Sequence, residues 1–345
     1  MLLEPSSLKI LKNRKNLLAF SAGVDSTALY HLLKEQNVSF DIAIVNYKAR
    51  EQSDEEVAYA LKLAQDDNKR CFFLESKLSG KNFEHDAREI RYRFFEELIQ
   101  KHNYNNLITA HQLDDMLEWS LMQLCKGCGL AELIGMQPIE SREDYNIIRP
   151  LLFTPKKSLL KFLETKRVKY FLDHTNQSDS FKRNRFRKYA SSFLMESSSS
   201  GIAKSFKFLL QDKIDCFLPP KIIFKSKKFY CIKTPDNDKL LIHQIDTLLK
   251  KEGYVVSTAQ RNHILNSRSV VIGGKWSIEI TDKLTFICPY IKPGSLKMPK
   301  WFKERCRELK IGSKVRPYLY SLEEFTNLFL SLNPSSTYFF QKSYI

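Results

Sequence analysis

A chain of 345 residues, 43% of them hydrophobic, is long enough for two domains of ordinary size, each with a packed core. No apolar run approaches the roughly 18 residues that a membrane helix needs, and the lysine-rich first residues do not resemble a signal peptide. The seven scattered cysteines favour reduced thiols over a disulfide framework. We therefore expect a cytoplasmic protein that has no membrane partner.

The net charge of +16 is well beyond what solubility requires. A cationic excess of this size attracts polyanions, because basic side chains neutralise phosphates and release counterions. A lysine-rich proteome in the source organism would produce the same charge. Composition therefore favours a nucleic-acid partner but does not establish one.

The first half of the chain alternates short apolar runs with amphipathic stretches. Strands are predicted at residues 17–20, 41–45, 70–74 and 106–110. Helices are predicted between and after them, at residues 27–34, from 53 onward, at 83–101, and from the HQLDD segment to about 124. Strands that alternate with helices of this length predict a doubly wound α/β domain, with a mostly parallel sheet and helices on both faces.

Two further helical signals follow in the chain. Thr154 and Pro155 are typical of an N-cap followed by proline at the first helical position, for a helix that runs to about residue 166. Residues 181–194 form a basic, aromatic segment that is compatible with a helix. We expect both segments to belong to the first domain.

The serine-rich segment MESSSSG is the most linker-like stretch of the chain. It predicts a first domain at residues 1–194, a linker at 195–204 and a second region at 205–345. Within that region the sequence predicts a short helix and two strand-like runs, at 205–216, 222–232 and 276–288. We expect a smaller C-terminal α+β domain.

The segment SAGVDS lies between a predicted strand and a predicted helix, and consists of Ser21, Ala22, Gly23, Val24, Asp25 and Ser26. A turn of small residues there lets backbone N–H groups approach an anion at the positive end of the helix. The hydroxyls of Ser21 and Ser26 can donate to phosphate oxygens. Asp25 beside a phosphate implies an intervening Mg²⁺ ion. An ordinary strand–turn–helix junction is the simpler alternative.

Three ionisable residues follow the fourth predicted strand: His111, Asp114 and Asp115. Because parallel strands end at one edge of a sheet, we expect these residues near SAGVDS, at the edge where such folds bind ligands. An imidazole and carboxylates there can hold Mg²⁺ or polarise an attacking amine. Helix N-capping is the structural alternative, and it explains one aspartate more readily than the pair.

SAGVDS resembles the SGGxDS signature of the PP-loop ATP pyrophosphatases, which bind ATP, adenylate a carbonyl oxygen and release pyrophosphate. Ala22 stands where this family usually has its first glycine. If that position needs a positive φ, alanine costs about 1–2 kcal/mol. If it needs only a small side chain, alanine is harmless. Because Gly23 is retained, we favour the second interpretation.

Later segments, in the same order as in the family, resemble the tRNA(Ile)-lysidine synthetases. TAHQLDDMLE (109–118) is similar to their TAHHxDDQxET, KGCGLAELIGM (126–136) to RGxGLxGLxGM, and DHTNQSDSFKRNRFR (173–187) to DxSNxDxxFxRNxxR. The predicted helix at 83–101 carries the family's AR..RY pattern, so Arg88 and Arg91 can face the active-site edge. A solvated helix face is an equally good interpretation of these two arginines.

The resemblance implies a reaction in which ATP adenylates the wobble cytidine of a CAU-anticodon tRNA(Ile) and free L-lysine then displaces AMP. It implies ATP and Mg²⁺ as cofactors, with ATP on the SAGVDS loop. Asp25 and Asp115 are then the candidates for the metal or phosphate side, and His111 for assisting the cytidine or the amine. Arg183 and Arg187 are the candidates for contacts to ATP or tRNA phosphates. A homodimer is left open.

The C-terminal region is expected to hold the body of the tRNA. Between residues 296 and 316, eight Lys and Arg stand against two Glu, with Trp301 and Phe302 among them. Cations beside aromatic rings suit an RNA surface. A solvated helix whose aromatic rings lie in the core is the alternative.

Three rival functions remain open from the sequence. A tRNA 2-thiolation enzyme of the same superfamily would use a cysteine motif, and Cys125 and Cys128 have C-x-x-C spacing without a second pair nearby. A non-catalytic RNA-binding relative would tolerate Ala22, but it would not need Asp25, His111 or Asp115. An amidotransferase is disfavoured because the chain contains no glutaminase domain.

Overall fold

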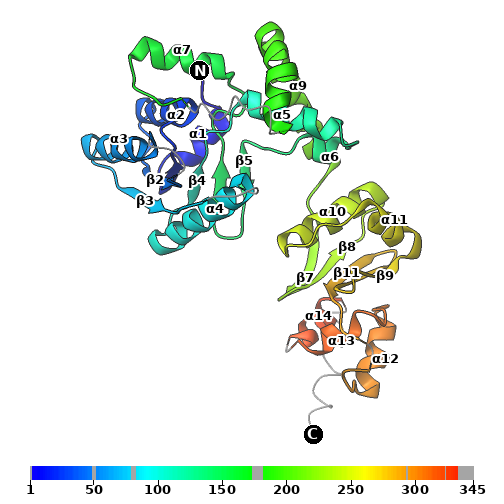
Figure 1. Cartoon of the computed structure of the whole chain (residues 1–345). Coiled ribbons are helices and arrows are strands. Elements are labelled where there is room, and N and C mark those ends of the chain that lie inside the picture. The colour runs from blue at the N-terminus through cyan, green and yellow to red at the C-terminus, as the bar shows by residue number, and fades with distance from the viewer. Residues whose placement is uncertain are drawn as a thin grey trace. The chain divides into compact units, whose positions relative to one another are not determined.

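The computed structural model describes residues 2–48, 52–78, 83–172, 182–292, 294–322 and 324–332. Its internal contacts divide the chain into two compact units, Met1–Lys213 and Ile214–Ile345 (Figure 1). Within the described residues, no helix is both long and apolar enough to cross a lipid bilayer. Part of the basic segment at 173–187, up to residue 181, lies outside the described residues.

The first unit is built on a six-stranded sheet with the strand order β3-β2-β1-β4-β6-β5. Five strands run parallel, and β5 pairs antiparallel with β6. The strands are β1 (Asn16–Ala19), β2 (Asp41–Asn46), β3 (Cys71–Glu75), β4 (Asn106–Ile108), β5 (Ile139–Ser141) and β6 (Asn146–Ile148). The predicted mostly parallel sheet is confirmed.

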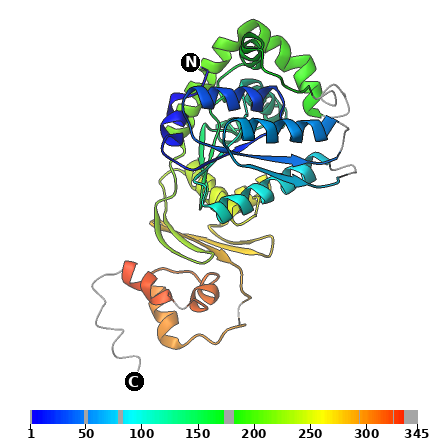
Figure 2. The ribbon, with the colours of Figure 1, turned by 90° about the vertical axis from the view of Figure 1, so that its left-hand side faces the viewer.

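Helices cover both faces of this sheet (Figure 2). Leu17 and Leu18 are neighbours in β1, yet they are buried in different core clusters, because successive side chains of a strand point to opposite faces. Strands buried on both sides have continuous apolar sequences, which is why they could be recognised. One face packs against α1 (Pro5–Leu11), α2 (Val24–Glu35), α3 (Gln52–Asp66) and α7 (Lys156–Lys166), and the other against α4 (Phe83–His102).

A third cluster of the first unit joins α5 (Leu113–Leu124), α6 (Leu130–Leu133) and α9 (Ser192–Cys216). The segment predicted as a linker at 195–204 therefore lies inside α9, which has a kink at Ser198. Met195 and Phe206 are buried against α5. Ser197 donates its hydroxyl to the carbonyl of Phe193 at 2.9 Å, so a serine is accommodated within the helix. The division between units comes later than predicted, after Lys213.

The start of α7 also differs from the expected cap. Pro155 precedes the helix and makes no side-chain cap, and the hydroxyl of Thr154 donates to the carbonyl of Leu2. Instead, Asp114 of α5 accepts a hydrogen bond from the backbone N–H of Lys156 at 3.0 Å. The N-terminus of α7 is thus capped by a residue that is distant in the sequence.

The second unit contains a five-stranded antiparallel sheet with the order β7-β8-β11-β10-β9. Each strand-like run predicted from the sequence forms two strands joined by a turn. The strands are β7 (Ile222–Ser226), β8 (Phe229–Lys233), β9 (Ser269–Ile272), β10 (Trp276–Ile280) and β11 (Leu284–Pro289). The expectation of a smaller C-terminal domain with mixed helices and strands is confirmed.

Both faces of the second sheet are also covered. Tyr230 and Ile287 lie in one core cluster, whereas Cys231 and Phe286 lie in the other. The first cluster includes α10 (Asp238–Lys251) and α11 (Thr258–Ser267); the second includes α12 (Lys300–Glu308), α13 (Arg316–Tyr320) and α14 (Phe325–Leu332). Cys231, Cys288 and Cys306 are buried thiols of this second cluster.

Candidate active site

The candidate site lies where β1 and β4 are neighbours in the first sheet. The two strands pair in parallel, with Leu17 opposite Leu107 and Leu18 opposite Ile108. Strands β2 and β3 lie on one side of β1, and β4 lies on its other side. The direction in which successive strands are added to the sheet therefore reverses between β1 and β4. Open α/β sheets bind ligands outside the carboxyl ends of the strands at such a point. Residues 21–26 follow β1 and residues 109–115 follow β4, so the structure brings both segments to this edge.

The backbone of the loop after β1 is left-handed at Ala22, with φ of 57°. The carbonyl of Ala22 accepts a hydrogen bond from the N–H of Phe171 at 3.0 Å, and Gly23 forms an isolated parallel bridge with Phe171. The interpretation that this position needs only a small side chain is therefore wrong. An L-residue in this conformation costs about 1–2 kcal/mol, and the surrounding contacts hold the loop in it.

The two serines of the loop shape its backbone. The hydroxyl oxygens of Ser21 and Ser26 lie 3.1 Å apart, and the N–H of Ser21 donates to Ser26 Oγ at 3.2 Å. Gly23 is the N-cap of α2 and Val24 its first residue. The N–H groups of the first helical turn have no intrahelical acceptors, and they point with the helix dipole toward the loop. This end of α2 can bind phosphate.

Asp25 lies in the first turn of α2, and its Oδ1 is buried without a hydrogen-bond partner among the described residues. Burial raises the pKa of its carboxyl group to about 7; Lys156 acts against this shift, and Asp115 adds to it. An orphaned carboxylate oxygen beside a second carboxylate is a suitable environment for a divalent cation. Lys156 was not identified from the sequence, because no local motif links the start of α7 to α2.

Asp115 makes contacts to two different elements. Its Oδ2 accepts from the N–H of Gln112 at 3.0 Å, which closes a capping box at the start of α5. Its Oδ1 accepts from Arg183 at 2.6 Å. Since Asp114 caps α7, both aspartates have structural roles, and capping explains more of this pair than we expected.

A buried glutamate anchors the two arginines that were predicted as phosphate contacts. Glu118 is 1% exposed and accepts from Arg183 Nε at 2.7 Å and from Arg187 Nε at 2.6 Å. The arginines come from α8 (Lys182–Phe186) and from the π-helical turn Arg187–Ser191. Glu118 was missed as a site residue, although it ends the 109–118 motif one helical turn after Asp115.

His111 lies beside this ion-pair network. Its Nδ1 is 2.9 Å from the hydroxyl oxygen of Thr109. Burial lowers the pKa of the imidazole to about 4, Asp115 acts to raise it, and Arg149 and Arg88 lower it further. The ring is therefore neutral near pH 7. The electrostatic effect on His111 also places Arg88 near this edge.

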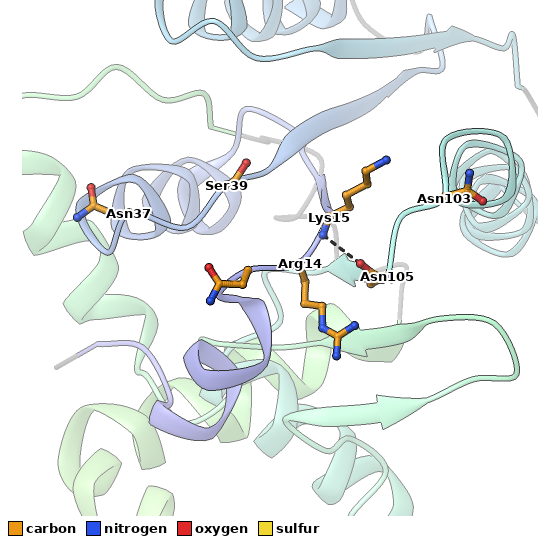
Figure 3. A pocket seen from close by; sticks show the side chains of 7 residues that line it. Arg14, Lys15, Asn37, Ser39, Asn103 and Asn105 are labelled. Atoms are coloured by element: carbon orange, nitrogen blue, oxygen red, sulfur yellow. Dashed lines mark hydrogen bonds between the residues drawn. The ribbon is translucent and has the colours of Figure 1, made fainter.

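Two other features lie apart from the candidate site. Cys125 is exposed and Cys128 partly exposed, and among the described residues no group of three or more His, Cys, Asp or Glu could hold a metal ion. A cavity of about 580 Å³ lies at the amino ends of the strands, the opposite edge of the sheet (Figure 3). It is lined by Asn13, Arg14, Lys15, Asn37, Ser39, Asn103 and Asn105.

Comparison with known proteins identifies the class and then the family. Residues 2–192 match the PP-loop domain, and the fold and the loop after β1 are those of a PP-loop protein. The chain is 44% identical to the tRNA(Ile)-lysidine synthase of Helicobacter pylori, over 94% of this chain and 95% of that protein. It is 42% identical to that of Wolinella succinogenes, over 90% of this chain and 94% of that protein. The chain belongs to the tRNA(Ile)-lysidine synthase family and is a ligase.

A solved structure supports the fold. The U34-tRNA thiolase NcsA from Methanococcus maripaludis, with its [4Fe-4S] cluster, superposes with a TM-score of 0.50 at 19% identity. The superposition covers 61% of this chain and 75% of that protein. Family membership rests on the synthase relatives, so the thiolase and non-catalytic alternatives are set aside.

Proposed function

We propose that the protein uses ATP to join free L-lysine to C2 of the wobble cytidine in a CAU-anticodon tRNA(Ile). The product, lysidine, pairs with adenine, so the codon read changes from AUG to AUA. The observation that carries this proposal is the Oδ1 of Asp25 in the first turn of α2, which is buried without a partner among the described residues while the nearby carboxylate of Asp115, at the start of α5, adds to the raised pKa of Asp25. The synthase relatives support the choice of substrate.

The reaction has two displacements. The C2 oxygen of the cytidine attacks the α-phosphorus of ATP, and the bond to pyrophosphate breaks. The ε-amine of lysine then attacks C2, AMP leaves with the oxygen, and the amine loses a proton. Catalysis needs positive charge at the transferring phosphoryl group and a positioned acceptor. In this proposal the N–H groups of the first turn of α2 and the guanidinium groups of Arg183 and Arg187 supply that charge.

Mg²⁺ is the metal that we propose for this site, with Asp25 and Asp115 as its protein ligands. Magnesium sites of nucleotide enzymes use one or two carboxylates, with water and phosphate oxygens completing the shell, so a cage of protein ligands is not required. When bound, the ion neutralises charge on the phosphates. Because Asp115 is paired with Arg183, binding there would weaken that pair and leave the guanidinium group more available to a phosphate.

His111 acts as a neutral hydrogen-bonding group in this proposal. With a pKa of about 4, the imidazole carries no proton to donate as an acid near pH 7. Its polar atoms can orient the cytidine or the attacking amine. The neighbouring hydroxyl of Thr109 orients the ring.

We propose that the second unit binds the tRNA body through α12. Phe302 and Cys306 are fully buried, so the core alternative holds for that aromatic ring, whereas Trp301 is 43% exposed. The exposed residues of α12 include Lys300, Lys303 and Arg307, beside Glu304 and Glu308. Cations on one helix face can bind phosphates without reading sequence.

The decisive experiment is incorporation of labelled lysine into CAU-anticodon tRNA(Ile) with ATP and Mg²⁺, with elongator methionine tRNA as the control. We expect ATP-dependent labelling of the isoleucine tRNA alone. The Asp25→Asn variant should lose both AMP formation and labelling while remaining folded. AMP formation without lysine transfer would contradict the proposed acceptor.

Sedimentation of the same sample tests whether the protein forms a homodimer. Localisation of the tagged protein tests the proposed cytoplasmic location.

A further inference from the structure

We propose that Tyr189 and Phe193 form a stacking platform for unpaired bases of the RNA substrate, on the outer face of the segment that carries the site arginines. Their side chains are 67% and 71% exposed, which is unusual for large rings. They lie four positions apart where the π-helical turn Arg187–Ser191 meets α9, so they share one side of the helix. The inference rests on the proposed RNA substrate.

The opposite side of this segment is fixed in place. Arg187 is held by Glu118 through two hydrogen bonds, at 2.6 and 3.1 Å. Ser191 is buried, and Met195 packs in the core that α9 shares with α5 (Figure 1). With these residues directed inward, the helix cannot rotate to bury Tyr189 and Phe193. Their exposure is therefore a property of the fold.

The π-helical turn Arg187–Ser191 explains how one helical segment directs an arginine inward to the site and an aromatic ring outward to solvent. A π turn contains an extra residue relative to an α turn and rotates the residues after it, and such turns often occur at functional sites. Here it starts at Arg187, which points to Glu118, and it contains Tyr189, which points to solvent. A ring two positions from a site arginine is suitably placed to hold a base next to the one that reacts.

The charge around the rings favours nucleic acid over a protein partner. Lys188 Nζ lies 5.0 Å from the centroid of the Tyr189 ring, and Arg185 is exposed one turn earlier. From residue 182 to 188 the sequence KRNRFRK contains no acid, and two of its five cations, Arg183 and Arg187, are directed inward to Glu118. Proteins that hold single-stranded nucleic acid combine backbone-binding cations with aromatic rings on which bases stack. An anticodon loop presents such unpaired bases.

The test compares full-length variants. In Tyr189→Ala/Phe193→Ala we expect the KM for tRNA to rise about 5- to 100-fold, as expected for the loss of one stacked base, with the KM for ATP unchanged. Phe73→Ala removes a ring that is 55% exposed on the edge strand β3 and is the matched control. Tyr189→Trp/Phe193→Trp should retain wild-type affinity, whereas Tyr189→Leu/Phe193→Leu should not, because leucine is apolar but has no aromatic face.

A second measurement does not depend on catalysis. A tRNA with 2-aminopurine in its anticodon loop should lose fluorescence on binding to wild type, and the alanine pair should abolish this quenching. If lysine incorporation fails but quenching is seen, the platform stands and the proposed reaction falls. Unchanged tRNA affinity and quenching in the alanine pair would overturn the platform. A change in oligomeric state confined to that variant would assign the face to a second copy instead.

Discussion

Arg187 and Glu118 form a two-bond ion pair: Arg187 Nε donates to Glu118 Oε1 at 2.6 Å, and Nη2 donates to Oε2 at 3.1 Å. The carboxylate is 1% exposed and also binds Arg183, so one buried glutamate orients both guanidinium groups. Bidentate ion pairs of this kind fix the orientation of both side chains. Removing one partner leaves the charge of the other uncompensated.

Replacing Glu118 should therefore affect both stability and catalysis. We expect Glu118→Ala to reduce the free energy of unfolding by about 1–3 kcal/mol, because two partly exposed arginines lose their shared partner while Arg183 keeps Asp115. Glu118→Gln keeps the shape, and it should lower kcat/KM for AMP formation about 100-fold through misplaced arginines. Urea unfolding and AMP release measure the two effects.

The control for Glu118 is Glu89→Gln, which breaks an exposed pair with Arg93 one helical turn away. Exposed pairs contribute about 0–1 kcal/mol, so neither stability nor rate should change appreciably. Equal losses in the two variants would show that Glu118 has no special role in holding the arginines.

Asp25 should make the ligand-free protein less stable as the pH rises. Burial raises its folded-state pKa to about 7 from an ordinary value of 3.8, so between these pH values the folded state binds the proton more tightly than the unfolded state. The contribution of this group to the free energy of unfolding is present at low pH and is lost as the pH rises toward 7. The total loss is about 4 kcal/mol. Asp25→Asn should therefore stabilise the protein more at pH 8 than at pH 5.

Asp41 is the matched control for Asp25. Burial acts to raise its pKa, but hydrogen bonds from Tyr104 and Arg70 outweigh that effect and lower it. Asp41→Asn should therefore destabilise the protein at pH 8, the opposite sign. A stability of Asp25→Asn that stays below wild type across this pH range would contradict the proposed burial cost.

Ala22→Gly should not destabilise the protein, although it removes a fully buried methyl group. Relief of the left-handed conformation gains about 1–2 kcal/mol, and loss of the methyl group costs about 0.8 kcal/mol. Ala28→Gly is the control, since Ala28 is equally buried but lies within α2. It should cost about 2 kcal/mol, from helix propensity and the lost methyl group. Equal changes in melting temperature in the two variants would contradict the proposed backbone strain at Ala22.

Serine replacements of Cys125 and Cys128 should leave lysine incorporation unchanged. One thiol is exposed, the other is partly exposed, and neither belongs to a metal-binding group among the described residues. The purified wild-type protein should show no visible absorbance from an iron–sulfur cluster. Loss of activity in the double variant, or a brown protein, would return the thiolase reaction to consideration.

The predictable part of this protein was local. Strands covered on both faces have continuous apolar runs, so residues 17–20 and 106–110 could be recognised as strands from the sequence. The chemistry-bearing motifs directly follow those strands, and parallel pairing necessarily brings strand ends to one edge. Asp25, His111 and Asp115 could therefore be placed together before their contacts were known.

The doubly wound class, the family motifs and the edge at which they meet could be read from the chain alone, because they depend on short-range patterns of apolar and polar residues. The left-handed backbone of Ala22, whose carbonyl accepts a hydrogen bond from the N–H of Phe171, comes instead from tertiary contacts. Tertiary contacts likewise account for the helical state of 195–204 and for the pairing of Glu118 with Arg183. These features depend on contacts between segments far apart in the chain, and their energies come from burial that no local window contains.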